Sequence, residues 1–199
     1  MGDPERTLEA LLKPCREALP AGEATTKAAP MRLYVPTTLP GLAAAYKAGE
    51  LGPGPLVAYA VTPGLREWYV SDDMEELEYA ALGRAAAASL RLVAGDPAAE
   101  RRRVVVAVDV ADHLVVVDPD GRGMDAGAIG EVRVEGAVPL KKAAAVHADA
   151  DDARDDVTAA AAALGAADLG DDDAQFVVDG AEDHELLWFG VQEIAGLIG

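Results

Sequence analysis

The chain has 199 residues, and its 35 acidic side chains outnumber 17 basic ones, so the formal net charge is −18 at pH 7. We therefore expect no nucleic-acid partner and no membrane partner, because both are bound through basic surfaces. Hydrophobic residues make up 51% of the chain and aromatic residues only 5%, which predicts a core built mainly of Val, Leu and Ala. A single cysteine, Cys15, and the lack of any apolar run of about 18 residues predict a soluble, cytoplasmic protein without disulfides.

The first 30 residues differ in composition from the rest of the chain. Residues 5–19 can form a short helix, and residues 20–30 consist mainly of Ala, Thr, Pro and Gly, which is typical of a flexible linker. Met31 then opens a stretch in which apolar and polar residues alternate, as they do in a strand. We therefore predict an N-terminal extension and linker over residues 1–30 and a single domain over residues 31–199.

Helix and strand signals alternate over the first part of this domain. The expected elements are a strand at 31–36, a helix at 39–48 capped by Thr38, a strand at 56–62, an extended stretch at 65–70 that lengthens this strand or pairs with it, a helix at 72–93 and a strand at 104–110. The last of these strands is apolar except for Asp109, which is typical of a central strand buried on both faces.

Strand signals then cluster before helices return. The expected elements are a strand at 114–117, a Gly- and Asp-rich loop at 118–130, a strand at 131–135, a segment at 139–148 that fits a strand or a helix, a helix at 152–164, an acidic loop at 170–173, a short extended piece at 176–178 and a helix at 182–198. In the last helix Leu187, Val191, Ile194 and Ile198 form one apolar stripe, with more apolar surface outside it. This helix is expected in the core, or shared with a partner subunit.

This order of elements predicts an α+β fold, in which a mixed β-sheet has helices packed mainly on one face and the C-terminal helix in the core. Five segments carry a resemblance to a known family: 31–38 (MRLYVPTT), 59–63 (YAVTP), 75–81 (EELEYAA), 102–105 (RRVV) and 173–188. They are similar to a family of short acidic actinobacterial proteins known only as a domain of unknown function. The resemblance covers residues 31–199, implies that the family's domain begins at Met31, and brings no activity, cofactor or catalytic residue with it.

Two acidic clusters have residue types that can bind a divalent metal. They comprise Asp72, Asp73, Glu75, Glu76 and Glu78, and Asp179, Glu182, Asp183, His184 and Glu185. Each cluster also contains Asp-x-x-Glu at the start of an expected helix, a variant of the capping box, and acids in a first turn complement the helix dipole. We favour capping for both clusters and predict no metal site.

Five side chains are singled out as candidate site residues. Asp109 stands near the C-terminal end of its strand, where open α/β sheets place ligand-binding groups, although it can instead cap the following turn. His184 is surrounded by acids and lies four residues before Trp188. Asp109 and His184 are therefore the candidate catalytic residues, and Asp183, Glu185 and Trp188 are the candidate binding residues.

The sequence shows no Gly-x-Gly-x-x-Gly after a strand, no phosphate loop with a lysine and no Gly-x-Ser-x-Gly elbow, so we expect no cofactor. We interpret the chain as a non-catalytic protein-binding or regulatory domain, whose partner is a basic protein or a second copy of itself. Two alternatives stay open. One is a metal-assisted hydrolase using Asp109 with His184 and acids of the terminal helix. The other is a nucleic-acid mimic, which requires acids in rows along one face.

Overall fold

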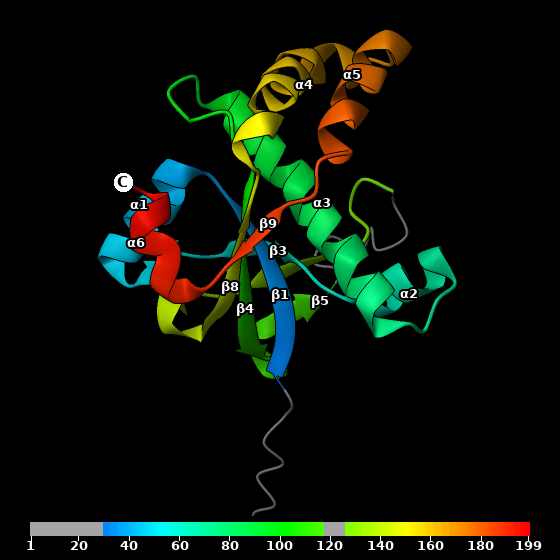
Figure 1. Ribbon diagram of the computed structural model, residues 1–199. Coiled ribbons are helices and arrows are strands. Elements are labelled where there is room, and N and C mark those ends of the chain that lie inside the picture. The colour runs from blue at the N-terminus through cyan, green and yellow to red at the C-terminus, as the bar shows by residue number, and fades with distance from the viewer. Residues whose placement is uncertain (1–29, 118–125) are drawn as a thin grey trace, which may run out of the picture.

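The computed structural model describes residues 30–117 and 126–199. The extension expected at 1–30, apart from Pro30, and the first part of the loop expected at 118–130 lie outside the described residues. Over the described part, the chain forms a seven-stranded sheet, a two-stranded sheet and six α-helices (Figure 1). The predicted α+β class is confirmed.

The large sheet has the strand order β5-β6-β3-β1-β4-β8-β9, and all its neighbours are antiparallel. Its strands are β1 (Pro30–Thr37), β3 (Leu56–Tyr59), β4 (Val104–Ala111), β5 (Val115–Val117), β6 (Glu131–Val134), β8 (Ala143–Ala148) and β9 (Leu187–Phe189). The centre of the sheet is the pair β1 and β4, matched along eight residues from Pro30 opposite Ala111 to Thr37 opposite Val104. The sheet is antiparallel rather than mixed, because hydrophobic alternation fixes which face a side chain takes and not the direction of the strand.

The longest helix, α3 (Met74–Gly95), crosses one face of this sheet. Its buried side, with Leu77, Ala81 and Ala85, packs with Tyr34 of β1 and Val105 of β4. Alanine at two of these positions lets the helix approach the strands closely. The helix α2 (Pro63–Tyr69) joins β3 to α3 on the same face.

Buried Ser89 fixes α3 to the sheet near the other end of the helix. Its Oγ donates to the carbonyl oxygen of Thr37 at 2.7 Å and accepts from the amide of Val104 at 2.8 Å. One hydroxyl therefore satisfies two strand-end backbone groups that would otherwise be buried without partners.

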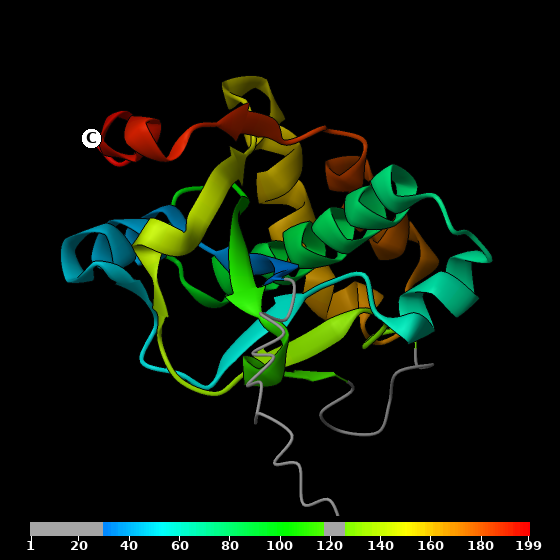
Figure 2. The same cartoon turned by 90° about the horizontal axis from the view of Figure 1, so that it is seen from below.

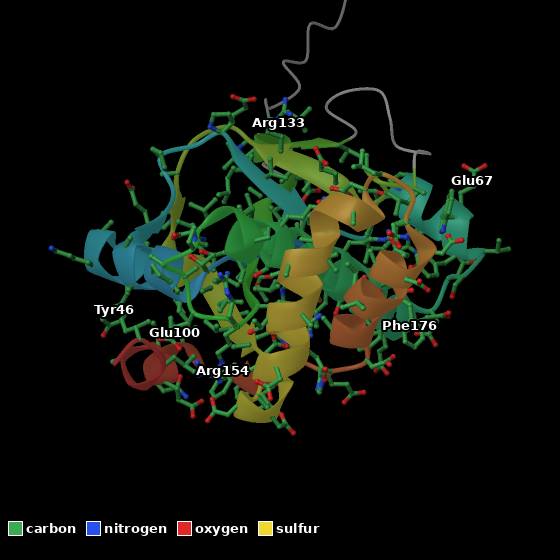
Figure 3. The ribbon with its side chains drawn as sticks, turned by 90° about the horizontal axis from the view of Figure 1, so that it is seen from above. Tyr46, Glu67, Glu100, Arg133, Arg154 and Phe176 are labelled. Atoms are coloured by element: carbon green, nitrogen blue, oxygen red, sulfur yellow. The ribbon has the colours of Figure 1, made fainter. Side chains whose placement is uncertain are left out.

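Two further helices, α4 (Arg154–Ala167) and α5 (Asp172–Glu182), form an outer layer against the C-terminal half of α3. Leu90 of α3 packs there with Val157, Leu164 and Val178. Figure 2 shows α3, α4 and α5 to one side of the sheet, with α1 and α6 to the other. An ion pair at 3.7 Å between Arg154 of α4 and Glu100 lies at the surface (Figure 3).

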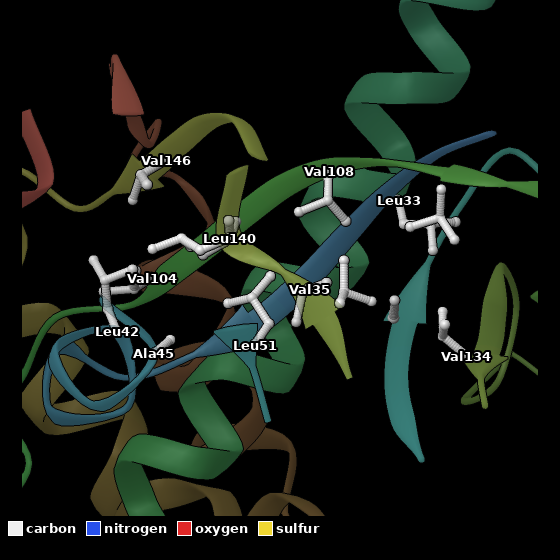
Figure 4. Close-up of a cluster of buried hydrophobic side chains, with 14 of the residues drawn as sticks. Leu33, Val35, Leu42, Ala45, Leu51, Val104, Val108, Val134, Leu140 and Val146 are labelled. Carbon is white, nitrogen blue, oxygen red and sulfur yellow. The ribbon is translucent and has the colours of Figure 1, made fainter. Parts of the chain in front are cut away.

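The second face of the sheet carries the largest apolar cluster (Figure 4). It is covered by α1 (Leu39–Ala48), by the small sheet of β2 (Glu50–Leu51) and β7 (Val138–Pro139), and by α6 (Ile194–Leu197). Figure 4 shows Leu42 and Ala45 of α1 near Val104 of β4. The expected cap of α1 is confirmed, since Thr38 Oγ1 accepts from the amide of Gly41 at 3.2 Å.

The stretch 65–70, expected to be extended, is helical in the structure. Thr62 caps α2 by accepting from the amide of Leu65 at 3.1 Å, and Pro63 occupies the first turn, where its missing N–H costs nothing. The helix ends at Val70, which adopts a left-handed conformation with φ of 50°. The apolar run of this stretch fits a helix and a strand equally, and the cap decides between them.

The prediction of a C-terminal helix over residues 182–198 is wrong. The chain instead forms β9, a short 3-10 turn and the four-residue α6. Hydrogen bonding to the free edge of β8 competes with helix formation here, and Phe189 pairs with Val146. Of the predicted stripe, only Ile194 is fully buried, whereas Leu187 is 48% exposed.

Helix boundaries before this point also differ from the prediction. Residues 176–178 are part of α5 rather than extended, because Asp171 caps this helix by accepting from the amide of Ala174. Asp179 and Glu182 therefore lie near the end of α5, and the capping interpretation of the second acidic cluster is wrong. For the first cluster capping is confirmed but shifted by one residue, since Asp73 caps α3 rather than Asp72 of the expected Asp72-x-x-Glu75 pattern. The segment 139–148 resolves into the end of β7, a 3-10 turn and β8.

Candidate functional site

A cavity of about 430 Å³ lies along one side of α3, and we call it the α3 groove. Its first wall is α3, and its second wall is the segment 182–186, which joins α5 to β9 and runs beside α3 (Figure 1). The α3 residues that line it include Glu76, Tyr79, Ala80, Gly83 and Ala87. Their spacing of three and four places them on one side of the helix.

The α3 wall of the groove is built of small residues. Ala80, Gly83 and Ala87 lie between Glu76 and the far end, and a Cβ added at Gly83 would have no atom within 4 Å. At a helical rise of about 1.5 Å per residue, the distance from Glu76 to Ala87 is about 16 Å. The groove is therefore long and open enough for several residues of another chain.

Exposed aromatic residues border the groove. Tyr69, at the end of α2, and Tyr79, on α3, both line it, and Tyr79 is 64% exposed. Trp68, Val70 and Met74, from the α2–α3 connection and its flanks, are exposed as well. Val70 is a β-branched residue held in the left-handed region, a conformation that costs energy and is enriched at functional positions.

Charges of both signs line the groove, with acids in excess. Glu76, Glu182 and Glu185 contribute carboxylates, against the guanidinium groups of Arg84 and Arg103. Desolvation raises the pKa of Glu182, and nearby Asp179 adds to the effect, while Arg103 acts in the opposite direction. The raised pKa shows that this carboxylate is held in a partly desolvated position although the residue is exposed.

Arg103 is the most buried charged residue that lines the groove, with 2% exposure. Its Nη2 donates to Asp149 Oδ1 at 2.7 Å, its Nε donates to Oδ2 at 3.0 Å, and its amide donates to Oδ2 at 2.7 Å. Nη2 also donates to the carbonyl oxygen of His184 at 3.0 Å. One buried ion pair thereby joins the ends of β4 and β8 and holds the second wall in place.

Arg103 Nη1 takes part in none of these hydrogen bonds. Among the described residues, no buried side-chain nitrogen or oxygen lacks a partner, so Nη1 remains in contact with solvent. Arg103 is also one of the residues that line the groove. The groove thus contains a hydrogen-bond donor on an otherwise buried side chain.

The structure brings two of the five predicted site residues to the groove. His184 and Glu185 both line it. The ring Nε2 of His184 lies 2.7 Å from Asp156 Oδ2 on α4. Asp183 follows the end of α5 without lining the groove, and Trp188 lies on β9, 62% exposed and opposite His147.

Asp109 is held elsewhere, in a cross-strand ion pair. Arg32 faces it in the register of β1 and β4, and Arg32 Nε lies 2.6 Å from Asp109 Oδ1. Asp109 does not line the groove that His184 lines. Within residues 30–117 and 126–199, no group of three or more His, Cys, Asp or Glu side chains is placed to hold a metal ion.

A second polar cluster lies on the α3 face of the sheet. Tyr34 is buried, and desolvation together with the nearby Glu78 raises its pKa to about 12. The rings of Tyr34 and His147 meet edge to face with centroids 6.4 Å apart. Burial lowers the pKa of His147, and the positive charge of Arg32 adds to this. None of these groups lines the groove.

Sequence reasoning missed Arg103, because a run of arginines just before a strand is usually a solvent-exposed segment that leads into the strand. The useful signal is its position beside Val104, the first residue of a strand that is apolar except for Asp109. Asp149 likewise follows the last residue of β8. Since β4 and β8 are antiparallel, with Val104 opposite Ala148, the two charges necessarily meet.

The molecule is thus an α+β protein with a groove beside its longest helix. Residues 31–198 match the model of the family of unknown function DUF6912, and the chain belongs to this family. The match begins at Met31, as the resemblance of the sequence implied. No curated protein and no solved structure matches the chain. Among the described residues, no helix is long and apolar enough to cross a membrane.

Proposed function

We propose that this protein is a non-catalytic binding domain that recognises a basic protein through the α3 groove. The observation that carries the proposal is the groove itself, a cavity of about 430 Å³ bordered by exposed Tyr69 and Tyr79 and by three carboxylates. Concave sites with aromatic and convergent polar groups are the usual form of binding sites. Tyrosine is also enriched at the contacts that dominate protein interfaces.

The charge of the chain supports a basic partner rather than a second copy. Two copies would each bring a net charge of −18 and repel one another, whereas a basic protein is attracted. In the groove the carboxylates outnumber the guanidinium groups, and the charge of Arg103 is already balanced by Asp149. The local charge therefore has the same sign as the charge of the whole chain.

Site-specific photo-crosslinking tests the proposal. A benzoylphenylalanine replaces Tyr79 in the groove, and a matched variant carries it at Tyr46, which is 47% exposed on α1. Figure 3 shows Tyr46 on the opposite side of the molecule from Glu67 of α2, the helix at the groove's end. In cells of the source organism, the Tyr79 variant should form an adduct with a basic protein that the Tyr46 variant does not form. No adduct, or equal adducts from both positions, would contradict the proposal.

A further inference from the structure

We propose that the α3 groove holds an extended segment of the partner. In this arrangement Arg103 Nη1 donates to a main-chain carbonyl oxygen of the segment, and a basic side chain of the segment lies against Tyr79 and the carboxylate of Glu76. The inference rests on the proposed function and specifies what the groove recognises.

The donor end of the groove is preorganised. Asp149 and the carbonyl oxygen of His184 hold the Arg103 guanidinium on two of its nitrogens, which fixes its geometry and leaves Nη1 outside these hydrogen bonds, on a residue that lines the groove. A donor held in this way loses little side-chain entropy when it binds. A carbonyl oxygen is the acceptor that any peptide segment presents, and its main chain can approach closely at small residues of the α3 wall such as Ala80, Gly83 and Ala87.

The dimensions of the groove fit an extended chain. Its length of about 16 Å corresponds to about five residues of a strand, which rises about 3.3 Å per residue. The open space over Gly83 leaves the middle of the path clear.

The other end of the groove suits a cation. The ring of Tyr79 is exposed and can stack against a guanidinium or ammonium group. Glu76 lies one helical turn before Tyr79 and supplies a carboxylate on the same side of the helix. A planar guanidinium group can stack on an aromatic ring and pair with a carboxylate, so arginine fits better than lysine.

Peptide binding followed by NMR tests this inference with the full chain. The probes are acetyl-Ala-Arg-Ala-Arg-Ala-amide and its acidic counterpart, acetyl-Ala-Glu-Ala-Glu-Ala-amide. We expect the arginine peptide to shift the amide signals of Tyr79, Gly83 and residues 182–186, with an affinity at least tenfold above that of the acidic peptide. Equal affinities for the two peptides, or shifts spread away from the groove, would overturn the inference.

A pair of glycine variants shows whether the groove is the site. Gly83→Leu places a side chain in the groove, and Gly165→Leu places the same side chain on α4, where a Cβ also has open space. Both substitutions raise helix propensity, so both variants should fold. Gly83→Leu should weaken arginine-peptide binding at least tenfold, and Gly165→Leu should leave it unchanged. Unchanged binding by Gly83→Leu would overturn the inference.

The two proposals fail in different ways. A Tyr79 adduct with a basic protein, together with no peptide shifts in the groove, would leave the binding function standing and overturn the extended segment. Absence of the adduct from Tyr79 would overturn the binding function on which the inference rests.

Discussion

Arg103 and Asp149 are the residues on which the sheet and the groove depend together. Both side chains are almost completely buried, with exposures of 2% and 0%. Such a pair is costly to form, and its removal on one side leaves the other charge without compensation. The second wall of the groove would then lose its tie to the ends of β4 and β8, because Arg103 is also bound to the carbonyl oxygen of His184.

Asp149→Asn should lower the free energy of unfolding by roughly 3–5 kcal/mol, the usual effect of breaking a buried ion pair. Urea denaturation measures the change. The matched control is Asp168→Asn, which breaks a second Arg–Asp pair of similar geometry, with two contacts of 2.8 Å to Arg91, at the exposed surface. Its effect should be much smaller, and equal losses in the two variants would contradict the role of burial.

His147 should titrate below the usual histidine pKa of about 6.5, because burial disfavours its charged ring. The unfolded chain then binds this proton more readily than the folded chain. The stability that neutral His147 contributes is therefore complete above about pH 6.5 and is lost as the pH falls through the folded pKa. NMR titration of the His147 ring measures the midpoint. A midpoint at or above 6.5 would contradict the burial of this side chain.

At the scale of elements, the C-terminal segment forms the edge strand of the large sheet. The strand β9 extends the edge of β8, and α6 returns to the opposite face, where Ile194 joins the main apolar cluster. A three-residue strand brings little stability of its own. The placement of this segment therefore depends on Ile194 and on the hydrogen bond from Arg103 to His184.

Ile194→Ala should lower the free energy of unfolding by about 2–5 kcal/mol, the range for truncating a fully buried aliphatic side chain. Leu187→Ala, in β9 with 48% of the residue exposed, serves as the control and should have a clearly smaller effect. Thermal or urea denaturation compares them. If Leu187→Ala lowers the free energy of unfolding as much as Ile194→Ala does, the greater burial of Ile194 would be contradicted.

Sequence reasoning succeeded where a local signal coincides with the tertiary structure. Thr38 caps α1, the long α3 follows from its capping acids, and Val104–Ala111 forms a buried strand as its apolar run predicts. It failed at residues 182–198, where apolar spacing fits a helix but the free edge of β8 offers a strand partner. Of the five candidate site residues, His184 and Glu185, in the acidic segment, line the groove. Arg103 and Tyr79 escaped sequence reasoning, because their proximity depends on strand pairing and helix packing.

At the scale of the whole molecule, acid density affects stability and supports the proposal of a basic partner. A net charge of −18 favours dissociated copies and attracts basic proteins at rates that fall with ionic strength. The same repulsion acts inside the folded chain, where acids gather at the starts of α4 and α5. Folding brings these charges closer together than the unfolded chain does.

Salt should therefore stabilise the protein. Raising NaCl from about 50 mM to about 500 mM shortens the Debye length from roughly 14 Å to roughly 4 Å and screens this repulsion. The midpoint of urea unfolding should rise with salt. A fall would mean that attractive ion pairs, such as the pair of Arg91 with Asp168, outweigh the repulsion.

The most direct test of groove-mediated binding repeats the crosslink from position 79 in two backgrounds, Gly83→Leu and Gly165→Leu. Binding through the α3 groove predicts that the adduct with a basic protein is lost when residue 83 fills the groove and persists when residue 165 changes on α4. An adduct that forms equally in both backgrounds would show that the partner binds outside the groove.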